Sequence, residues 1–325
     1  MIMDREFKEA LKGLPNVVAE LLSTAPAKVM QTAREVRLRA GRRACIVYLN
    51  KIYFFDREMG IGEIQECFRS LCGYSIHSHV EEIKQGFITI RGGHRAGLSG
   101  TAVYENDHLI NIRSINSINL RIARQIDGVA DNLINKLNGN LGKILIVGPP
   151  GSGKTTLVKD IVKNLIDKQV SLIDSRGEIA ACLNGMPQND VGNADVFDCW
   201  NRCDGIMTAI RTMNPELIVC DELGDSSDIK AIEACVGSGV QLIATAHGGN
   251  IDELCKRKII KKILSTKAFD KVVLLKGKET PCEIEEVYKV GDLLARIRGN
   301  HFNNMPYFDW TNLFNNFDKK SKTNR

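Results

Sequence analysis

The sequence predicts a two-domain α/β protein, with a smaller N-terminal α/β domain over residues 1–138 and a phosphate-binding α/β domain over 139–300. In the second part, short apolar runs alternate with helical patterns, which is typical of a parallel sheet covered by helices. One of these runs, Ile144–Val147, leads into a glycine-rich loop and then into a helical pattern. Residues 301–325 are expected to form a C-terminal tail that is disordered at its end.

The composition is that of an ordinary globular chain. Of the 325 residues, 43% are hydrophobic and 26% are charged, which excludes disorder of the whole chain. The formal net charge of +5 lies mostly in the N-terminal part and is too mild to require a nucleic-acid partner. Because no apolar run approaches the length of about 18 residues that a membrane span needs, we expect any membrane association to come through partners.

The ten cysteines are expected to be reduced. The first residues are charged and lack the apolar segment of a signal peptide, which favours a cytoplasmic location and free thiols. Cys199 and Cys203 lie one helical turn apart, but two ligands do not make a structural zinc site. The sequence therefore predicts no metal bound by cysteine.

The N-terminal elements follow from changes in the spacing of apolar residues. Residues 4–24 place apolar side chains near one helical face, with a break at Pro15. From Glu35 the spacing becomes two, which is the period of a half-buried strand. The elements expected after this point are strands at 36–38, 44–49 and 52–55, a helix at 61–72, a β-rich stretch at 86–113 and one or more helices within 115–137.

Within the β-rich stretch, Arg91–Gly97 (RGGHRAG) places two arginines on a turn-forming backbone. Two interpretations are open, a contact with an anion and a tight turn with solvated arginines. The tight turn is favoured.

The loop from Gly148 to Thr155 reads GPPGSGKT and fits the G-x-x-x-x-G-K-[ST] pattern of phosphate binding. A glycine-rich turn before a helix aims backbone N–H groups at a polyphosphate, and the helix dipole adds to the attraction. Lys154 would reach the β- and γ-phosphates of ATP, and Thr155 would hold Mg²⁺. The residues expected to bind the nucleotide are Gly148, Pro149, Pro150, Gly151, Ser152, Gly153, Lys154, Thr155 and Thr156.

Three further apolar runs end in polar residues, and ligands of open α/β sheets collect at such strand ends. These runs are Val170–Ile173, Leu217–Cys220 and Val240–Ala244, and a last pair of strands is expected near 271–276 and 283–289, before a helix near 290–298. After Cys220 come Asp221 and Glu222. Because a buried strand rarely ends in two acids without a cation, we expect Asp221 to face Mg²⁺ and Glu222 to face an attacking water.

The other strand ends add further candidates. Asp174 or Glu178 could orient water or metal, while Arg176 between them could contact phosphate or pair with its neighbours. His247 could bond the γ-phosphate and relay its loss. Arg202 and Arg211 precede the carboxylate strand, and each is either a group that neutralises charge on the γ-phosphate or a surface salt bridge.

At this point the residues resemble a known superfamily. The stretch 210–225 (IRTMNPELIVCDELGD), followed by Thr245–Gly248, is similar to the secretion ATPases of type II and type IV systems. With Arg91–Gly97 added, the chain is most similar to the stage III sporulation AA family of endospore-forming bacteria. The similarity covers nearly the whole chain and is strongest over 143–250.

The resemblance implies a RecA-like fold for the P-loop domain and a cytoplasmic homohexamer that hydrolyses ATP with Mg²⁺. Such a ring would lie at a membrane through its partners and energise a channel built by sporulation membrane proteins between mother cell and forespore. Asp174 and Glu178 would be the acidic box, Asp221 and Glu222 the Walker B acids, and His247 the histidine box. The superfamily's Walker B generally ends in Gly-Glu, so the division of metal and water duties between the two acids is open, and the tetracysteine motif of type II members is absent.

Two other functions stay open. One is a nucleic-acid-stimulated ATPase. The mild positive net charge and the 6% aromatic content argue against it. The other is a nucleotide-gated scaffold with little turnover. In a ring, Arg91, Arg95 or Arg124 could complete the site of a neighbouring subunit.

Overall fold

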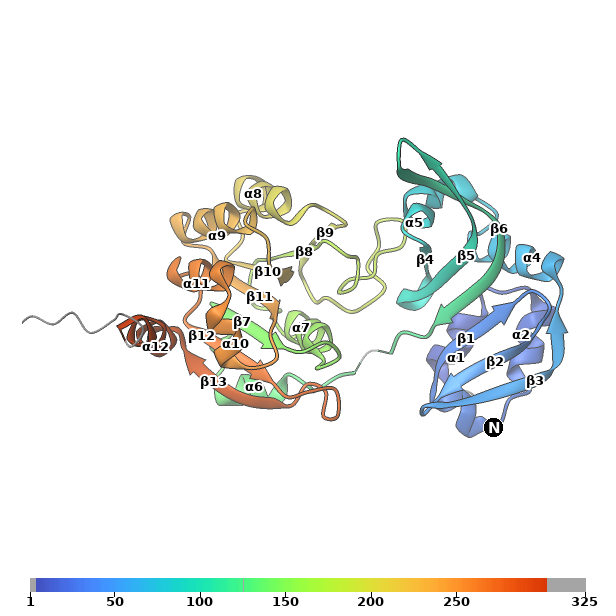
Figure 1. The fold of residues 1–325 in the computed structure, drawn as a ribbon, viewed down its shortest axis with the longest axis horizontal. Coiled ribbons are helices and arrows are strands. Elements are labelled where there is room, and N and C mark those ends of the chain that lie inside the picture. Colours follow the sequence, from blue (N-terminus) through green and yellow to red (C-terminus); the bar gives the residue numbers. More distant parts are fainter. Residues whose placement is uncertain (1–3, 125, 303–325) are drawn as a thin grey trace, which may run out of the picture.

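The computed structural model describes residues 4–124 and 126–302. The chain forms two sheets, joined by the segment that follows residue 121 (Figure 1). The N-terminal sheet has one hydrophobic core, and the C-terminal sheet has one on each face. None of the described helices combines the length and the apolar character that a membrane crossing requires.

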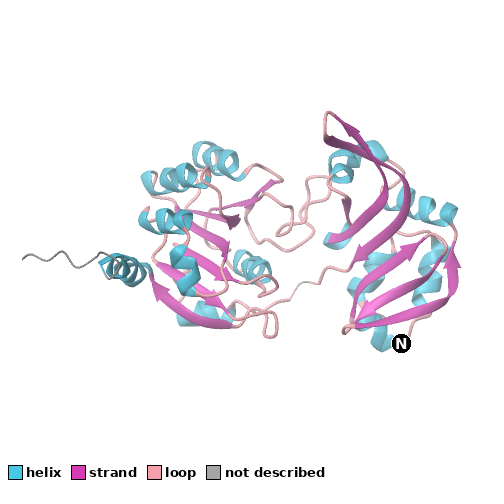
Figure 2. Ribbon diagram, viewed as in Figure 1, coloured by secondary structure: helices cyan, strands magenta, loops and turns pink. Residues whose placement is uncertain are grey.

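The N-terminal sheet has six strands in the order β3-β2-β1-β6-β5-β4, and all neighbours are antiparallel. Helices pack on one of its faces, where alternate strand residues such as Val36 and Leu38 are fully buried (Figure 2). The strands are β1 (Ala33–Arg39), β2 (Arg42–Tyr48), β3 (Lys51–Met59), β4 (Phe87–Ile90), β5 (His94–Glu105) and β6 (His108–Arg121). The helices are α1 (Arg5–Leu11), α2 (Asn16–Ser23), α3 (Ala27–Gln31), α4 (Ile61–Leu71) and α5 (Val80–Lys84), with 3-10 turns η1 (Ile76–His79) and η2 (Arg91–Gly93).

The expectation of helices from residue 115 onward is wrong for its first part, because β6 continues to Arg121. Ile118 and Leu120 are buried on either side of the half-exposed Asn119, which is a spacing of two. Over residues 117–121, strand β6 also pairs with both β1 and β5, so this part of its backbone is hydrogen-bonded on both edges. Pairing with two neighbours outweighs the low strand preference of its asparagine and serine residues.

The C-terminal sheet has seven strands in the order β13-β12-β7-β11-β10-β8-β9. Neighbours are parallel except β12 and β13. The strands are β7 (Ile144–Gly148), β8 (Val170–Asp174), β9 (Asp195–Asp198), β10 (Leu217–Leu223), β11 (Gln241–His247), β12 (Lys271–Leu275) and β13 (Ile284–Lys289). The predicted parallel sheet and its final strand pair are therefore confirmed, whereas β9 was missed because its short edge strand carries no apolar run.

Helices cover both faces of this sheet, and residues of β7 alternate between the two cores. Leu145 and Val147 pack with one group of helices, and Ile144 and Ile146 pack with the other. The first group is α8 (Arg202–Thr212), α9 (Asp228–Gly237), α10 (Ile251–Lys256), α11 (Lys258–Ser265) and α12 (Val290–Phe302), and the second is α6 (Asp131–Lys136) and α7 (Lys154–Lys163). Burial on both faces explains why these strands are continuous apolar runs.

Helix α6 precedes residue 138, where the domain boundary is expected, and its Leu133 belongs to the core shared with α7. The division of the chain into domains at 138 and 300 stays a prediction. The tail expected over 301–325 lies outside the described residues from 303 onward.

Candidate active site

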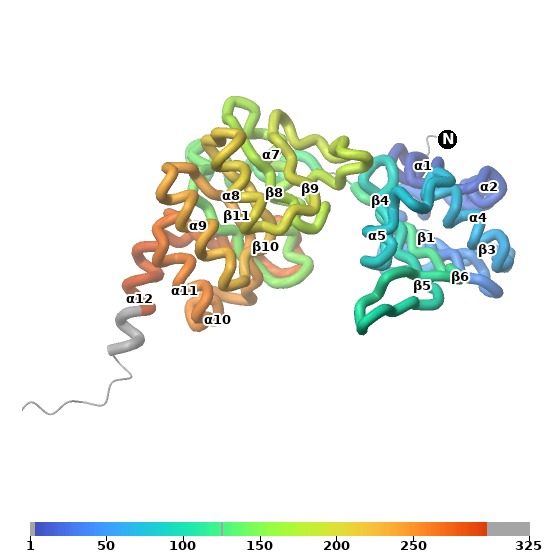
Figure 3. The backbone as a smooth tube through the Cα atoms, turned by 90° about the horizontal axis from the view of Figure 1, so that it is seen from above, coloured from blue at the N-terminus to red at the C-terminus, as the bar shows by residue number. Residues whose placement is uncertain are grey.

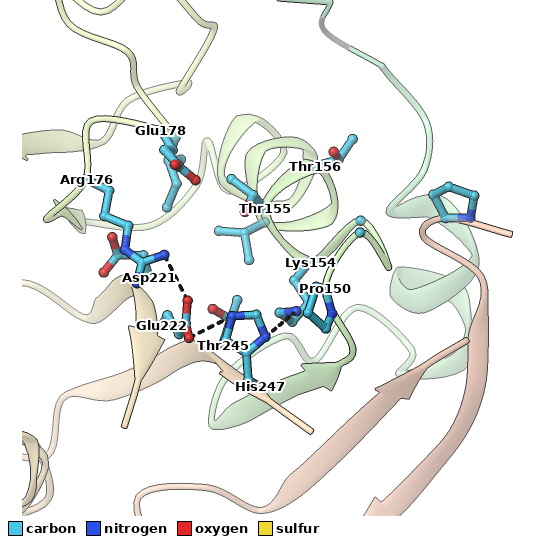
Figure 4. Close-up of a pocket in the computed structure, with 15 residues that line it drawn as sticks. Pro150, Lys154, Thr155, Thr156, Arg176, Glu178, Asp221, Glu222, Thr245 and His247 are labelled. Atoms are coloured by element: carbon cyan, nitrogen blue, oxygen red, sulfur yellow. Dashed lines mark hydrogen bonds and ion pairs between the residues drawn. The ribbon is translucent and has the colours of Figure 1, made fainter. Parts of the chain in front are cut away.

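The carboxyl ends of β7, β10 and β11 and the start of α7 surround a cavity of about 420 Å³ (Figure 4). It is lined by Pro150, Gly151, Gly153, Lys154, Thr155, Thr156, Val158, Arg176, Glu178, Ile179, Asp221, Glu222, Thr245, His247 and Pro281. The structure thus brings together most of the residues that the sequence predicts for the nucleotide site.

The loop between β7 and α7 has a shape that requires glycine. Gly151 and Gly153 have φ angles of 77° and 86°, which lie in the left-handed region that favours glycine. A Cβ atom on Gly148 would lie 2.4 Å from Oγ of Ser152, which is buried beneath the loop. A Cβ atom on Gly153 would lie 2.5 Å from Sγ of Cys282. The loop is therefore packed from below by Ser152 and from the side by the β12–β13 connection.

Lys154 begins helix α7 and is held against its own loop. Its Nζ donates to the carbonyl oxygens of Gly148 and Pro149, at 2.8 and 3.0 Å, and lies 3.3 Å from Nδ1 of His247. Burial lowers the pKa of Lys154, while the charge of Glu222 opposes this shift. Two carbonyls and an imidazole nitrogen are weaker partners for an ammonium group than a phosphate oxygen. The lysine is thus placed to exchange these contacts for phosphate.

At the end of β10, Asp221 is buried and has one unsatisfied oxygen. Its Oδ1 accepts hydrogen bonds from Oγ of Ser175 at 2.9 Å and from Nη1 of Arg202 at 3.1 Å. Its Oδ2 is buried without a hydrogen-bond partner among the described residues. Such an orphaned carboxylate oxygen is costly unless a cation or water binds it. Asp221 lines the same cavity as Thr155.

Glu222 lies between two basic side chains (Figure 4). Its Oε2 is 3.0 Å from Nη1 of Arg176, and its Oε1 is 2.8 Å from Nε2 of His247. With Nδ1 of His247 facing the Lys154 ammonium, a neutral ring that accepts at Nδ1 and donates from Nε2 satisfies both contacts. Lys154, His247, Glu222 and Arg176 therefore form one continuous polar chain across the cavity.

At the end of β8, Asp174 is fully buried and does not line the cavity. Its Oδ1 accepts from the amide of Glu178, and its Oδ2 accepts from the amides of Ile179 and Ala180, all at 2.8 to 2.9 Å. Burial raises the pKa of Asp174 to about 6, although the backbone hydrogen bonds lower it. Asp174 thus fixes the turn that carries Arg176 and Glu178, and neither of its oxygens is turned to the substrate space.

Neither predicted arginine lies on the cavity. Arg202 is behind Asp221, where Nε and Nη2 contact the buried carboxylate of Asp228 at 2.9 and 3.3 Å. Burial opposes its charge, but the hydrogen bonds and charge of Asp228 outweigh burial and raise the pKa of Arg202. Arg211 is exposed on α8 and contacts only Oγ1 of Thr208, at 3.4 Å, within the described structure.

The turn Arg91–Gly97 is the predicted tight turn: η2 connects β4 to β5, with positive φ at Gly92 and Gly93. Its Arg95 nevertheless reaches the C-terminal part of the same chain and contacts Glu178 at 3.3 Å. Arg124 is paired within the N-terminal part, 2.6 Å from Asp4. Within one chain, Arg95 is therefore an N-terminal arginine that contacts a residue of the cavity.

Two contributors were missed by sequence reasoning. Thr245 is buried and lines the cavity, two residues before His247 in strand β11. The connection between β12 and β13 closes over the loop, because the amide of Cys282 donates to the carbonyl of Ser152 at 2.8 Å and Pro281 lines the cavity. The Thr245 position could have been found from its place at a strand end. The connection gave no signal beyond a turn at Gly277 and Pro281.

The fold and the glycine-rich loop define the class as α/β proteins with a RecA-like P-loop fold. Among solved structures, the chain is similar to the ATPase DotB of Legionella pneumophila, with a TM-score of 0.51 at 18% identity over 81% of this chain and 76% of that one. It is also similar to the pilus retraction motor PilT with bound ADP, with a TM-score of 0.50 at 15% identity over 79% and 76% of the two chains. At these identities the similarity shows the fold.

Within that class, the chain belongs to the family described as sporulation stage III, protein AA, which matches residues 7–293. It is 35% identical to the stage III sporulation protein AA of Bacillus subtilis (strain 168), over 90% of this chain and 98% of that protein. The predicted family is therefore confirmed. The chain is a member of a sporulation family and has the fold of ATPases.

Proposed function

We propose that the chain hydrolyses ATP to ADP and phosphate at the cavity between β7, β10 and β11. The observation that carries the proposal is the arrangement of Lys154 and Glu222 on either side of His247, beside the unpaired oxygen of Asp221. A cation, a proton acceptor and a site for a metal then surround one phosphate-binding loop. These are the parts that phosphoryl transfer to water requires.

Binding begins at the loop. The backbone amides before α7 point toward an anion, and the helix dipole favours negative charge there. Lys154 leaves the carbonyls of Gly148 and Pro149 and donates to phosphate oxygens instead, because a charged acceptor forms the stronger hydrogen bond. Thr156 and Pro150 line the rest of the cavity and would contact the nucleotide further from the transferred phosphate.

The donor set fits magnesium. Mg²⁺ is usually held by one or two protein oxygens together with substrate phosphates, and the hydroxyl of Thr155 and Oδ2 of Asp221 would hold it here. When bound, Mg²⁺ neutralises charge on the phosphates. This assigns the metal to Asp221 and leaves the water to Glu222.

Glu222 acts as the general base. Its carboxylate takes a proton from the attacking water, and Nε2–H of His247 keeps Oε1 oriented toward the cavity. Arg176 is the more exposed partner of Glu222, with a side chain that is 58% exposed. It can leave Oε2 of Glu222 for the γ-phosphate, where a guanidinium stabilises the charge of the transition state. His247 also contacts Lys154, so the loss of the γ-phosphate is transmitted to Glu222 through one ring.

We infer further that the protein works as a homohexameric motor subunit and energises a membrane channel of the sporulation apparatus. Membership of the sporulation family and the secretion-ATPase fold support this proposal. A ring would allow hydrolysis in one subunit to shift an interface with the next.

The test is phosphate release from ATP by the purified chain and by Lys154→Ala, with nucleotide binding measured in parallel. We expect Lys154→Ala to lower phosphate release by about a hundredfold or more, because it removes a charge-assisted contact with the transferred phosphate. Lys230→Ala is the matched control, since Lys230 is exposed on α9, and it should hydrolyse ATP like the parent. Equal release by Lys154→Ala and the parent would contradict the proposal.

A further inference from the structure

Arg95 crosses from the N-terminal sheet to the turn that carries two residues of the cavity. It lies in β5, directly after the η2 turn, and its Nη2 donates to the carbonyl oxygens of Arg176 and Gly177 at 2.6 and 2.8 Å. Its Nη1 is 3.3 Å from Oε1 of Glu178. The segment between β8 and β9 reaches across to this turn, as Figures 1 and 3 show from two directions.

Other contacts hold Arg95 in place. Its guanidinium carbon lies 4.6 Å from the ring centroid of Phe87 in the neighbouring strand β4, which is a cation–π distance. The amide of Gly92 donates to Oε1 of Gln188 at 3.0 Å, so the η2 turn touches the same segment a second time. Arginine presents several donors in a planar fork, which is the geometry needed to bond two carbonyls and a carboxylate together.

The turn that Arg95 grips is held from two sides. From within the C-terminal core, Asp174 accepts the amides of Glu178, Ile179 and Ala180. From the N-terminal sheet, Arg95 holds the carbonyls of Arg176 and Gly177. Gly177 has a φ of 58°, so the chain reverses between these two anchors. Asp174 lies at the end of β8, in the same sheet as the strands around the cavity, whereas Arg95 lies in the N-terminal sheet and holds the turn only when that sheet is docked.

The side chain of Arg176 leaves this turn toward Glu222 and contacts it at 3.0 Å. A displacement of the backbone at Arg176 would therefore move a guanidinium that pairs with the general base. Misplacement of a positioned group by about 1 Å can cost about a hundredfold in rate. The contacts of Arg95 thus link the position of the N-terminal sheet to the geometry around Glu222.

We propose that Arg95 is a positioning residue that acts within its own chain: it clamps the turn at 176–178, and so makes the placement of Arg176 at the active site depend on the docking of the N-terminal sheet. The proposal rests on the function proposed above for Glu222. The basic turn of the N-terminal part then controls the site of its own chain, because Arg95 fixes the backbone at Arg176.

The test is a double-mutant cycle of Arg95→Ala and Arg176→Ala. We expect Arg95→Ala alone to lower kcat for ATP by about tenfold with a nearly unchanged KM, because the nucleotide-binding loop is not touched. In the Arg176→Ala background, the same change should lower kcat by at most about twofold, because the residue through which Arg95 acts is gone. Equal effects in both backgrounds would overturn the proposal. Arg113→Ala, an exposed arginine of β6, is the control and should match the parent.

A second measurement does not depend on hydrolysis. Hydrogen exchange of the amides of 175–180 should be faster by about tenfold in Arg95→Ala and unchanged in Arg113→Ala. Arg95→Lys, which keeps the charge but lacks the fork, should fall between the parent and Arg95→Ala. Unchanged exchange in Arg95→Ala would overturn the clamp. If the parent releases no phosphate in a Lys154-dependent manner, the proposed function fails, and the exchange result still decides whether Arg95 holds the turn.

Discussion

Strands β8 and β10 lie side by side in the C-terminal sheet, and both carry acidic residues at or next to their carboxyl ends, but these acids have different surroundings. At the end of β10, Asp221 keeps one oxygen unpaired and Glu222 faces the cavity. At the end of β8, both carboxylate oxygens of Asp174 accept hydrogen bonds from backbone amides. Strand β10 continues past its acids, whereas β8 stops and turns at Gly177. A carboxylate at a strand end is therefore available for chemistry only where the amides of the following turn do not hydrogen-bond both of its oxygens.

Among the acids of the two strand ends, the largest effect on ATP hydrolysis is expected when Asp221 loses its charge. Asp221→Asn should lower kcat for ATP by about a thousandfold and weaken the dependence of nucleotide binding on Mg²⁺, because an amide oxygen is a poorer ligand for a hard cation. Phosphate release and nucleotide binding across a magnesium titration measure both effects. Asp195→Asn, on an exposed residue of β9, is the control. An unchanged magnesium dependence would show that Asp221 does not hold the metal.

The next difference concerns Arg202, which donates a hydrogen bond to Asp221. Arg202→Ala should lower the free energy of unfolding by about 3 kcal/mol, because it leaves the carboxylate of Asp228 buried without its charge partner. Arg211→Ala, on the exposed part of the same helix, should change that free energy by less than about 0.5 kcal/mol. Urea unfolding of the two variants measures the contrast. Similar losses in both would contradict the assignment of Arg202 to the support of the site.

The smallest expected difference is in how the stability contributed by Asp174 depends on pH. Its pKa is raised from 3.8 to about 6 by burial, so the folded chain binds the proton more tightly than the unfolded one. The stability that this residue contributes is present in full below about pH 4 and is lost as the pH rises through about 6. The difference of about two pH units corresponds to about 3 kcal/mol at most, and solvent relaxation will reduce it.

Asp174→Asn does not titrate, so it should cost more stability at pH 4.5 than at pH 7. Unfolding of the parent and the variant at the two pH values measures this, with Asp195→Asn as a control that should show little pH-dependent change. A cost that is larger at pH 7 would mean that the three backbone hydrogen bonds outweigh burial.

The C-terminal sheet could be predicted from the sequence because its strands are buried on both faces and appear as apolar runs between helical patterns. The loop from Gly148 to Thr155 followed from a motif whose glycines the backbone requires. Strand β6 was partly mistaken for helix, because its pairing partners lie far away in sequence. Pairing of this kind leaves only a weak local signal.

Most of the residues predicted for the site line the cavity, but Asp174, Arg202 and Arg211 do not, and the sequence does not predict how the side chains are oriented. The sequence places Asp174 at a strand end and Arg202 and Arg211 in the segment before the carboxylate strand. It does not say that Asp174 accepts backbone amides or that Arg202 pairs with the buried Asp228. The contacts from Arg95 to the turn at 176–178 join residues 81 to 83 positions apart and depend on how the two sheets meet. Such long-range contacts follow from tertiary packing.

The central claim is that Glu222 activates water at this P-loop, and a single-turnover measurement with Glu222→Gln tests it most directly. Glutamine keeps the shape and the contact with His247 but cannot accept the proton, so ATP should bind about as tightly as in the parent while phosphate release slows by about a thousandfold. Glu233→Gln, an exposed glutamate of α9, should behave like the parent. Phosphate release by Glu222→Gln at the parent's rate, with ATP bound, would contradict the account.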